Sequence, residues 1–477
     1  MKRTKVNLSN YKLATADMGQ LVPVQCQEIL PGDTMRLSTS ALIRMSPMMA
    51  PVMHPVQVRF HHWFVPARLL WDKWEDFITG GKDNANADTI PKHQLSSTPE
   101  NGVLDYMGVP PVQGLEVNAL PLRAYNMIYN EFYRDQDLQG ERDLEDNSLA
   151  HVSWRKDYFT AARPWPQKGS DLVLPIGTEA PVIPELGEDS LVWLKNPDNP
   201  SAYNGMSKTT STMSFSSSSN TSDGTHVPAL VADLSHATGV TATEFREFFA
   251  LQRYAEARAR YGSRYTEYLR YLGIKPSDAR LQRPEYLGGG KSTLQFSEVL
   301  QTAEGTNPVA TMRGHGITGI KTKNTRRFFE EHGYVITLMS VIPKSIYQDG
   351  APRMWFKHDK EHFFQKELQN IGQQKVLQGE VYAKQLGQEM ETFGFTDRYS
   401  EYTSTPSSVA GEFRKDLDYW HLARKFADVP RLNSDFITCK PSKRIFAEQT
   451  KHSLWCMINN SVVARRMVKK TSVGKLL

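Results

Sequence analysis

The sequence has few cysteines and no long apolar run. Its three cysteines, Cys26, Cys439 and Cys456, are far apart in a chain of 477 residues, and no two have Cys-x-x-Cys spacing. This pattern excludes a disulfide framework and a cysteine zinc site, and it favours a reducing cytoplasm. No stretch approaches the ~18 consecutive apolar residues of a membrane helix. The start of the chain also lacks the apolar segment of a signal peptide. We therefore expect no membrane insertion.

The sequence also lacks a strong net charge. The formal charge of +5 is too small to identify a nucleic-acid-binding protein. However, the first sixteen and the last thirteen residues contain no acidic residue. Their basic residues are Lys2, Arg3, Lys5 and Lys12 at the start, and Arg465, Arg466, Lys469, Lys470 and Lys475 at the end. Such ends suit contact with a polyanion, because each neutralised phosphate releases counterions. Solvated tails that aid solubility are the alternative.

The hydrophobic pattern predicts a mainly β protein. Segments 21–29, 34–45 and 55–66 are rich in β-branched and aromatic residues and are separated by turn signals. Segment 333–343 is a continuous apolar run, which is typical of a strand buried on both faces, and a last strand is expected within 453–463. Helical spacing of aromatic residues predicts a helix over 122–134, packed in the core.

Between the β segments we expect a long insertion over 196–290, which would divide the chain into 1–195, 196–290 and 291–477. Residues 196–225 are dominated by Ser and Thr and predict an exposed loop or protrusion. A Thr-x-x-Glu capping box at Thr241 and Glu244 opens a helix that should end at Gly262. A second helix should end at Gly273.

Two glycine-rich stretches partly match nucleotide-binding motifs. YLGGGKST, residues 286–293, ends like a phosphate-binding loop, but Glu285 stands where the first glycine is required. We expect these glycines to form the turn by which the insertion returns to the β core. GHGITG, residues 314–319, matches Gly-x-Gly-x-x-Gly but lacks the flanking strand and helix of a dinucleotide site, and we expect a flexible loop there.

The histidines do not indicate a metal site. His358 and His362 have the i, i+4 spacing of two ligands on one helix face, but no third ligand is suggested. We expect these residues, and the pair His61 and His62, to be solvated or packed. Neither a nucleophile elbow nor a recognisable carboxylate pair is present. We therefore expect no catalytic residues, no cofactor, no metal ion and no enzymatic activity.

Several rare strings occur in one order along the chain. They are GQLVPVQCQEILPGDT, FHHWFVPARLLWDKWEDFITG, LPLRAYNMIYNEFYRDQDL, DYFTAARPWPQKG, SDARLQRPEYLGGG, GYVITLMSVIPKSIYQDG, FGFTDRYSEYTSTPSSVAGEFR and LDYWHLARKF. Together they strongly resemble the major capsid protein of gokushoviruses, small tailless single-stranded DNA phages of the microvirus group. The resemblance covers residues from about 15 to 437 and leaves out 198–228 and both ends.

This resemblance implies an eight-stranded antiparallel jelly roll that assembles through pentamers into a T=1 icosahedral shell around circular single-stranded DNA. In that family an insertion protrudes at each threefold axis for host attachment. The implied partners are other copies of the chain, the genome, a small basic DNA-packaging protein, a scaffolding protein and a host receptor. The expected locations are the virion and, during assembly, the host bacterial cytoplasm.

Three groups of residues are candidates for these contacts. For DNA they are Lys2, Arg3, Lys5, Arg465, Arg466, Lys469 and Lys470. For the host-facing loop they are Ser207, Ser216, Ser217, Ser218 and Asn220. For subunit interfaces they are Trp63, Trp71, Trp74 and Trp165, because large rigid aromatic residues anchor interfaces, although packing within one subunit explains them nearly as well. Two other classes remain open: a β-sandwich carbohydrate-binding protein or phage depolymerase, and a nucleotide-dependent enzyme.

Overall fold

The structure is a computed structural model. It describes residues 3–468 except 82–87, 96–101, 171, 173–181, 185–191, 196–202, 210–211, 219–229, 233–241, 301 and 303–309. The chain divides into two compact units. One comprises Met1–Pro166 and Glu256–Leu477, and the other comprises Gln167–Ala255. The expected insertion, 196–290, overlaps the second unit but begins and ends later in the sequence.

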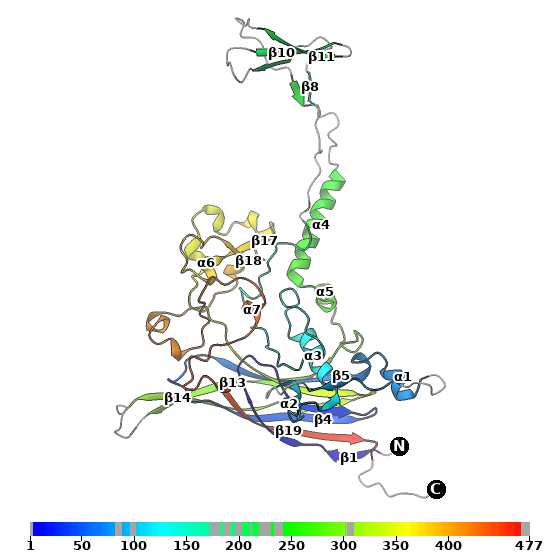
Figure 1. Ribbon diagram of the computed structural model, residues 1–477. Coiled ribbons are helices and arrows are strands. Elements are labelled where there is room, and N and C mark those ends of the chain that lie inside the picture. The colour runs from blue at the N-terminus through cyan, green and yellow to red at the C-terminus, as the bar shows by residue number, and fades with distance from the viewer. Residues whose placement is uncertain are drawn as a thin grey trace. The chain divides into compact units, whose positions relative to one another are not determined.

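The first unit is built on one curled ten-stranded antiparallel sheet, which can be described as two four-stranded sheets joined along β13 (Figure 1). The first sheet has the order β2 (Asn10–Ala16), β19 (Leu454–Arg466), β4 (Thr34–Met45) and β14 (Met312–Lys321). The second has the order β3 (Val22–Ile29), β16 (Gly333–Pro343), β5 (Val56–Pro66) and β13 (Glu285–Leu300). The long strand β13 pairs with β5 and then with β14, so it joins the two sheets.

The chain alternates between the two sheets in the manner of a jelly roll. Strands β2 and β4 lie in the first sheet, whereas β3 and β5 lie in the second. After the long connection from β5, strands β13 and β16 add to the second sheet and β14 and β19 add to the first. The expected eight-stranded jelly roll is confirmed. Two short strands, β1 (Thr4–Asn7) beside β19 and β15 (Thr325–Phe328) beside β4, extend the first sheet.

Packing on both sides of β16 explains why most of its residues are apolar. All eleven of its residues are buried. Val341 packs between the two sheets with Val58 and Phe60, whereas Ile336 packs on the outer side with residues of helix α3 (Leu120–Phe132) such as Tyr125. A strand with apolar neighbours on both sides needs no polar alternation, so the predicted two-sided burial is confirmed.

Both glycine-rich stretches lie in strands, so the predictions of a turn over 286–293 and of a flexible loop over 314–319 are wrong. Gly289 lies opposite His61 in the pairing of β13 with β5, and a Cβ atom on it would be 2.1 Å from the Phe60 carbonyl oxygen. Gly314 in β14 likewise lies against the Ala50 carbonyl. Glycine within a strand marks such close approaches of backbone, which a sequence pattern does not reveal.

The helices follow the predicted stop signals. α4 (Ala242–Tyr261) ends before Gly262, and α5 (Tyr265–Tyr271) ends shortly before Gly273. Both glycines have positive φ, +97° and +82°, which favours glycine at a helix end. Thr241 of the expected capping box lies outside the described residues. No helix in the described ranges is long and apolar enough to cross a bilayer.

The connections of the first unit carry short elements. They are α1 (Trp74–Thr79), α2 (Val103–Met107), α6 (Gln378–Val381) and α7 (Ser434–Ile437), with the paired strands β6 (Lys92–Gln94) and β7 (Glu116–Asn118), and β17 (Gln373–Leu377) and β18 (Thr392–Asp397). The last pair lies in the connection from β16 to β19.

The second unit contains two small antiparallel sheets. One comprises β9 (Val192–Lys195), β10 (Tyr203–Thr209) and β11 (Thr212–Ser218), and the other comprises β8 (Val182–Pro184) and β12 (Leu230–Ala232). The prediction of a loop is therefore wrong for the described part of 196–225. Met213 and Phe215 alternate with serines in the sequence, which is the period of a strand, but the Ser/Thr-rich composition masked this signal.

Candidate nucleic-acid interface

The two basic ends of the chain meet in one sheet. Strand β1 pairs with the end of β19 in antiparallel register, which places Lys5 directly opposite Arg465. Figure 1 shows this first strand and the last strand of the chain side by side. The sequence predicted two separate basic ends. Their pairing concentrates both at one edge of the first sheet.

Two arginines from other strands extend this cluster. Arg36 of β4 lies opposite Val463 of β19, and Arg326 of β15 lies opposite Arg36. Because side chains alternate along a strand, these arginines share the outer face of the sheet with Lys5 and Arg465. We call Lys5, Arg36, Arg326 and Arg465 the basic face, and all four are exposed.

The basic face has no internal charge compensation. Its residues line a shallow depression of about 210 Å³ together with Thr34, and none of the described residues that line it is acidic. Like charges directly opposite each other on neighbouring strands destabilise a sheet, and Lys5 with Arg465 and Arg36 with Arg326 are two such pairs. A bound polyanion would relieve this repulsion.

The other predicted DNA contacts have different environments. The Nη2 atom of Arg466 donates a hydrogen bond of 2.7 Å to Oδ2 of Asp33, whose side chain is fully buried. Arg3 lies 5.0 Å from the ring centre of Phe328, next to the basic face. Lys2, Lys469 and Lys470 lie outside the described residues. The sequence analysis did not identify Arg36 or Arg326 as DNA contacts. For Arg36 a signal was available, because this arginine occupies an outward-facing position of the predicted strand 34–45.

An exposed apolar surface continues the same face of the sheet. Trp455 of β19 lies opposite Arg44, and Met457 lies between Leu13 of β2 and Leu42 of β4. We call Tyr11, Leu13, Trp455 and Met457 the apolar face. Tyr11 and Leu13 are 74% and 80% exposed. With Lys12 and Arg44, three of these four residues (Leu13, Trp455 and Met457) line a groove of about 590 Å³. Such exposure on a sheet indicates a surface that a partner covers.

The predicted interface tryptophans differ in burial. Trp63 is 4% exposed, its ring lies 4.1 Å from that of Phe132, and its Nε1 atom donates a hydrogen bond to the Tyr133 hydroxyl. This favours packing within one subunit for Trp63. Trp71 and Trp74 lie partly buried against the same core, and Trp165 is also partly buried.

The predicted host-facing residues belong to the second unit. Ser207 lies in β10, and Ser216, Ser217 and Ser218 end β11. In the pairing of these strands Ser216 lies opposite Gly205. Asn220 lies outside the described residues. The structure therefore places four of the five residues on one β-hairpin.

Two histidines, His54 and His62, are buried and packed against polar groups of the chain, whereas His358 is exposed. His62 is fully buried and its ring nitrogens contact the hydroxyl groups of Thr337 and Thr322 at 2.9 and 3.2 Å. Nε2 of His54 lies 2.8 Å from the Lys344 carbonyl oxygen. Burial lowers the pKa of each of these two histidines to about 4. The described residues contain no group of three or more His, Cys, Asp or Glu side chains that could hold a metal ion.

These buried histidines predict acid lability. An unfolded histidine takes up a proton near pH 6.5, whereas His54 and His62 stay neutral in the fold down to about pH 4. The free energy of unfolding should therefore fall as the pH drops from 6.5 to 4, by on the order of 2 kcal/mol for each residue. Urea unfolding at pH 7.5 and pH 5 measures the effect, and His62→Gln should reduce it. Equal stability at both pH values would contradict the assignment.

Comparisons with known proteins agree with this architecture. A family model described as capsid protein (F protein) matches residues 1–474. The chain is 37% identical to capsid protein VP1 of Bdellovibrio phage phiMH2K over 91% of this chain and 87% of that protein. It is 31% identical to capsid protein VP1 of Chlamydia phage 1 over 92% and 89% of the two chains, and 30% identical to that of Spiroplasma virus 4 over 91% and 87%. The chain therefore belongs to the F-protein family of phage capsid proteins and is a major capsid protein of the Microviridae.

Proposed function

We propose that this capsid protein assembles through pentamers into a small T=1 shell that encloses circular single-stranded DNA, and that the basic face contacts this genome. The observation that carries the proposal is the convergence of both chain ends on an acid-free surface. Phosphate neutralisation by such a surface gives affinity without sequence preference, as packaging a whole genome requires. Family membership favours this function over a carbohydrate-binding protein or a depolymerase.

The apolar face supports single-stranded rather than double-stranded DNA. Proteins that bind single strands combine cations along the backbone with aromatic side chains on which bases stack. Tyr11 and Trp455 are large exposed aromatic residues on the same sheet face as Arg36 and Arg465. Paired bases in a duplex cannot reach such a platform, whereas unpaired bases can.

Neutralising the two arginines that lie opposite each other tests this proposal. The variant Arg36→Gln with Arg326→Gln removes half of the basic face and leaves Arg466 and its buried partner intact. Each lost phosphate contact should reduce the magnitude of the slope of log K against log salt concentration by about 0.7 for single-stranded DNA. The loss of two contacts should therefore reduce it by about 1.4. Filter binding of an oligonucleotide to disassembled subunits measures the slope, and the DNA content of purified shells measures packaging.

The matched control is Lys275→Gln with Arg280→Gln, which neutralises two exposed basic residues outside the strands. The control should package DNA normally. Shells of the Arg36 and Arg326 variant with normal DNA content and an unchanged salt slope would refute the proposed contact.

We propose further that the second unit provides the host-attachment protrusion at the threefold axes. The support is the Ser/Thr-rich hairpin of β10 and β11, whose composition suits a solvated surface. Deleting 198–228 should leave assembly intact and weaken attachment to host cells, measured by particle yield and adsorption rate. Loss of assembly would show that the segment is structural. A packaging protein, a scaffolding protein and assembly in the host cytoplasm complete the proposal.

A further inference from the structure

A polar cavity of about 310 Å³ lies on the outer side of the second sheet, between β5 and segment 152–156. Its floor includes Arg59 and His61 of β5 and Ser340 of β16. In the pairing of these strands Ser340 lies directly opposite Arg59. The end of α3 and the start of α5 complete the lining. This face of the second sheet is turned away from the space between the two sheets, whereas the basic face lies on the outer face of the first sheet.

Six basic side chains and three carboxylates line this cavity. The basic residues are Arg59, Arg134, Arg155, Lys156, Arg163 and Arg264, and the acidic ones are Asp135, Asp137 and Glu267. Because the basic groups outnumber the carboxylates, the pairing of each charged group determines which cations remain available to a ligand.

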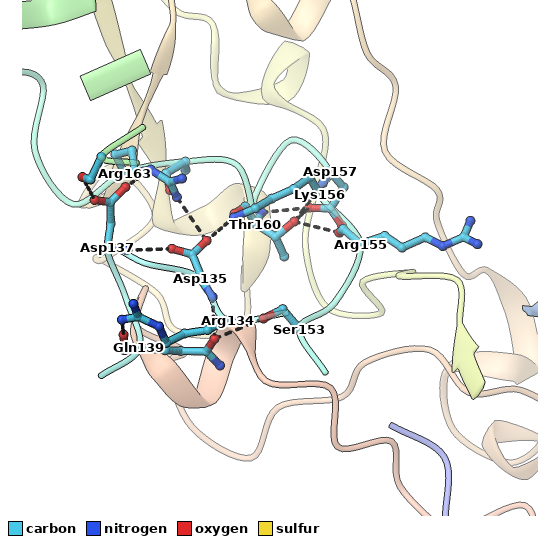
Figure 2. Close-up of polar contacts among 12 residues, drawn as sticks. Arg134, Asp135, Asp137, Gln139, Ser153, Arg155, Lys156, Asp157, Thr160 and Arg163 are labelled. Atoms are coloured by element: carbon cyan, nitrogen blue, oxygen red, sulfur yellow. Dashed lines mark hydrogen bonds and ion pairs between the residues drawn. The ribbon is translucent and has the colours of Figure 1, made fainter. Parts of the chain in front are cut away.

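Each of the three carboxylates already has a partner. Asp135 accepts from Lys156 and lies 3.5 Å from Nη1 of Arg163, and Asp137 lies 3.2 Å from Nε of the same arginine (Figure 2). Glu267 accepts a hydrogen bond of 3.1 Å from the backbone N–H of Arg264. Two of these carboxylates are paired with Lys156 and Arg163, and the third is held by a backbone N–H.

Two of the other arginines are also engaged. Arg134 pairs with Glu141 at 3.0 Å and donates to the Gln139 carbonyl oxygen. Arg264 donates to the carbonyl oxygens of Asn130 and Arg134 at 2.7 and 3.2 Å. Their donors are used within the chain.

Arg59 and Arg155, in contrast, have side-chain donors without partners among the described residues. Nε of Arg59 and both Nε and Nη2 of Arg155 are buried and have no hydrogen-bond partner within the described part of the chain. In Figure 2 the Arg155 side chain extends away from Asp135, and its guanidinium joins none of the drawn contacts. Burial, and then the charge of Arg59, lower the pKa of Arg155, so the two cations interact unfavourably. Unsatisfied buried donors and like charges are both costly.

We propose that this cavity binds a small oxyanion of the phosphate class between the guanidinium groups of Arg59 and Arg155. A guanidinium offers parallel N–H donors that match two oxygens of a phosphate. A tetrahedral anion in the cavity would accept hydrogen bonds from the guanidinium groups of both arginines and offset their repulsion. A free ion fits better than DNA, because the proposed genome contact lies on the outer face of the other sheet. The choice of a free ion over DNA therefore rests on the proposed function, whereas the arginine pair that would bind the ion does not.

Titration calorimetry of purified shells with inorganic phosphate, in a chloride buffer of constant ionic strength, tests the site. Wild-type shells should show one saturable site per subunit. Arg155→Gln should weaken phosphate binding at least about tenfold, as expected for lost hydrogen bonds to a charged group. Arg280→Gln, at an exposed position outside the cavity, should bind phosphate as the wild type does.

Thermal unfolding separates ligand binding from a structural role. Phosphate should raise the melting temperature of wild-type shells by mass action, and Arg155→Gln should lose this rise while keeping the wild-type melting temperature in chloride. If that variant does not assemble, Arg59→Gln is measured in the same way. Phosphate binding that is absent in the wild type or unchanged in both variants would overturn the proposal. So would a density map in which a neighbouring subunit's side chain fills the cavity.

Discussion

Replacing Gly289 with alanine is expected to prevent assembly of the shell. The added Cβ atom would lie 2.1 Å from the Phe60 carbonyl oxygen, far inside van der Waals contact, because Gly289 sits where β13 pairs with β5. The backbone of a strand cannot move aside as a flexible side chain can, so β13 would have to separate from β5. We expect a loss of about 3 kcal/mol in the free energy of unfolding, at the upper end for overpacking.

Gly319→Ala is the matched control. Gly319 also lies in a core strand, β14, but a Cβ atom there would meet nothing within 4 Å. Alanine loses less backbone entropy than glycine on folding, so this variant should be as stable as the wild type or slightly more stable. Shell yield and thermal unfolding distinguish the two variants. Normal shells from Gly289→Ala would show that the two strands tolerate a wider separation.

Replacing Arg466 with alanine is expected to cost about 3–5 kcal/mol, the range found when one partner of a buried ion pair is removed. Asp33 is fully buried and its Oδ2 atom accepts hydrogen bonds from Arg466 and from the Leu30 backbone N–H. Its Oδ1 atom has no partner in the described residues. Without Arg466 the charge of Asp33 would remain uncompensated inside the protein.

The neighbouring residue Arg465 provides a matched control. Arg465→Ala removes the same charge from the same strand, but this side chain is exposed and belongs to the basic face. It should change the free energy of unfolding by no more than about 0.5 kcal/mol and should lower DNA content instead. Urea unfolding of disassembled subunits measures both variants. Equal stability of the two would refute the structural role of Arg466.

If Arg466→Ala is destabilised as expected, Asp33→Asn in the same chain should recover part of the loss, because the amide carries no charge. A double-mutant cycle gives the coupling between the two residues. Independent effects of the two substitutions would contradict direct pairing.

The sequence alone determined the fold class, the family and the boundaries of four of the eight jelly-roll strands. β3, β4, β5 and β16 lie within one residue of the segments predicted from β-branched and aromatic runs. Strand and helix periodicity is a local property, so it can be read without knowing the partners. The rare strings of the family resemblance are also local, and the comparison with capsid proteins confirmed them.

Only the tertiary structure decided which residues meet. Pairing of the first and last strands places Lys5 beside Arg465 and gives adjacent arginines different roles, since Arg465 is exposed and Arg466 reaches a buried carboxylate. The same is true of Gly289, whose need for close contact depends on a strand more than two hundred residues earlier in the chain. Arg59 and Arg155 share a cavity for the same reason. Sequence periodicity specifies which face of a strand is apolar, but long-range pairing chooses its neighbours.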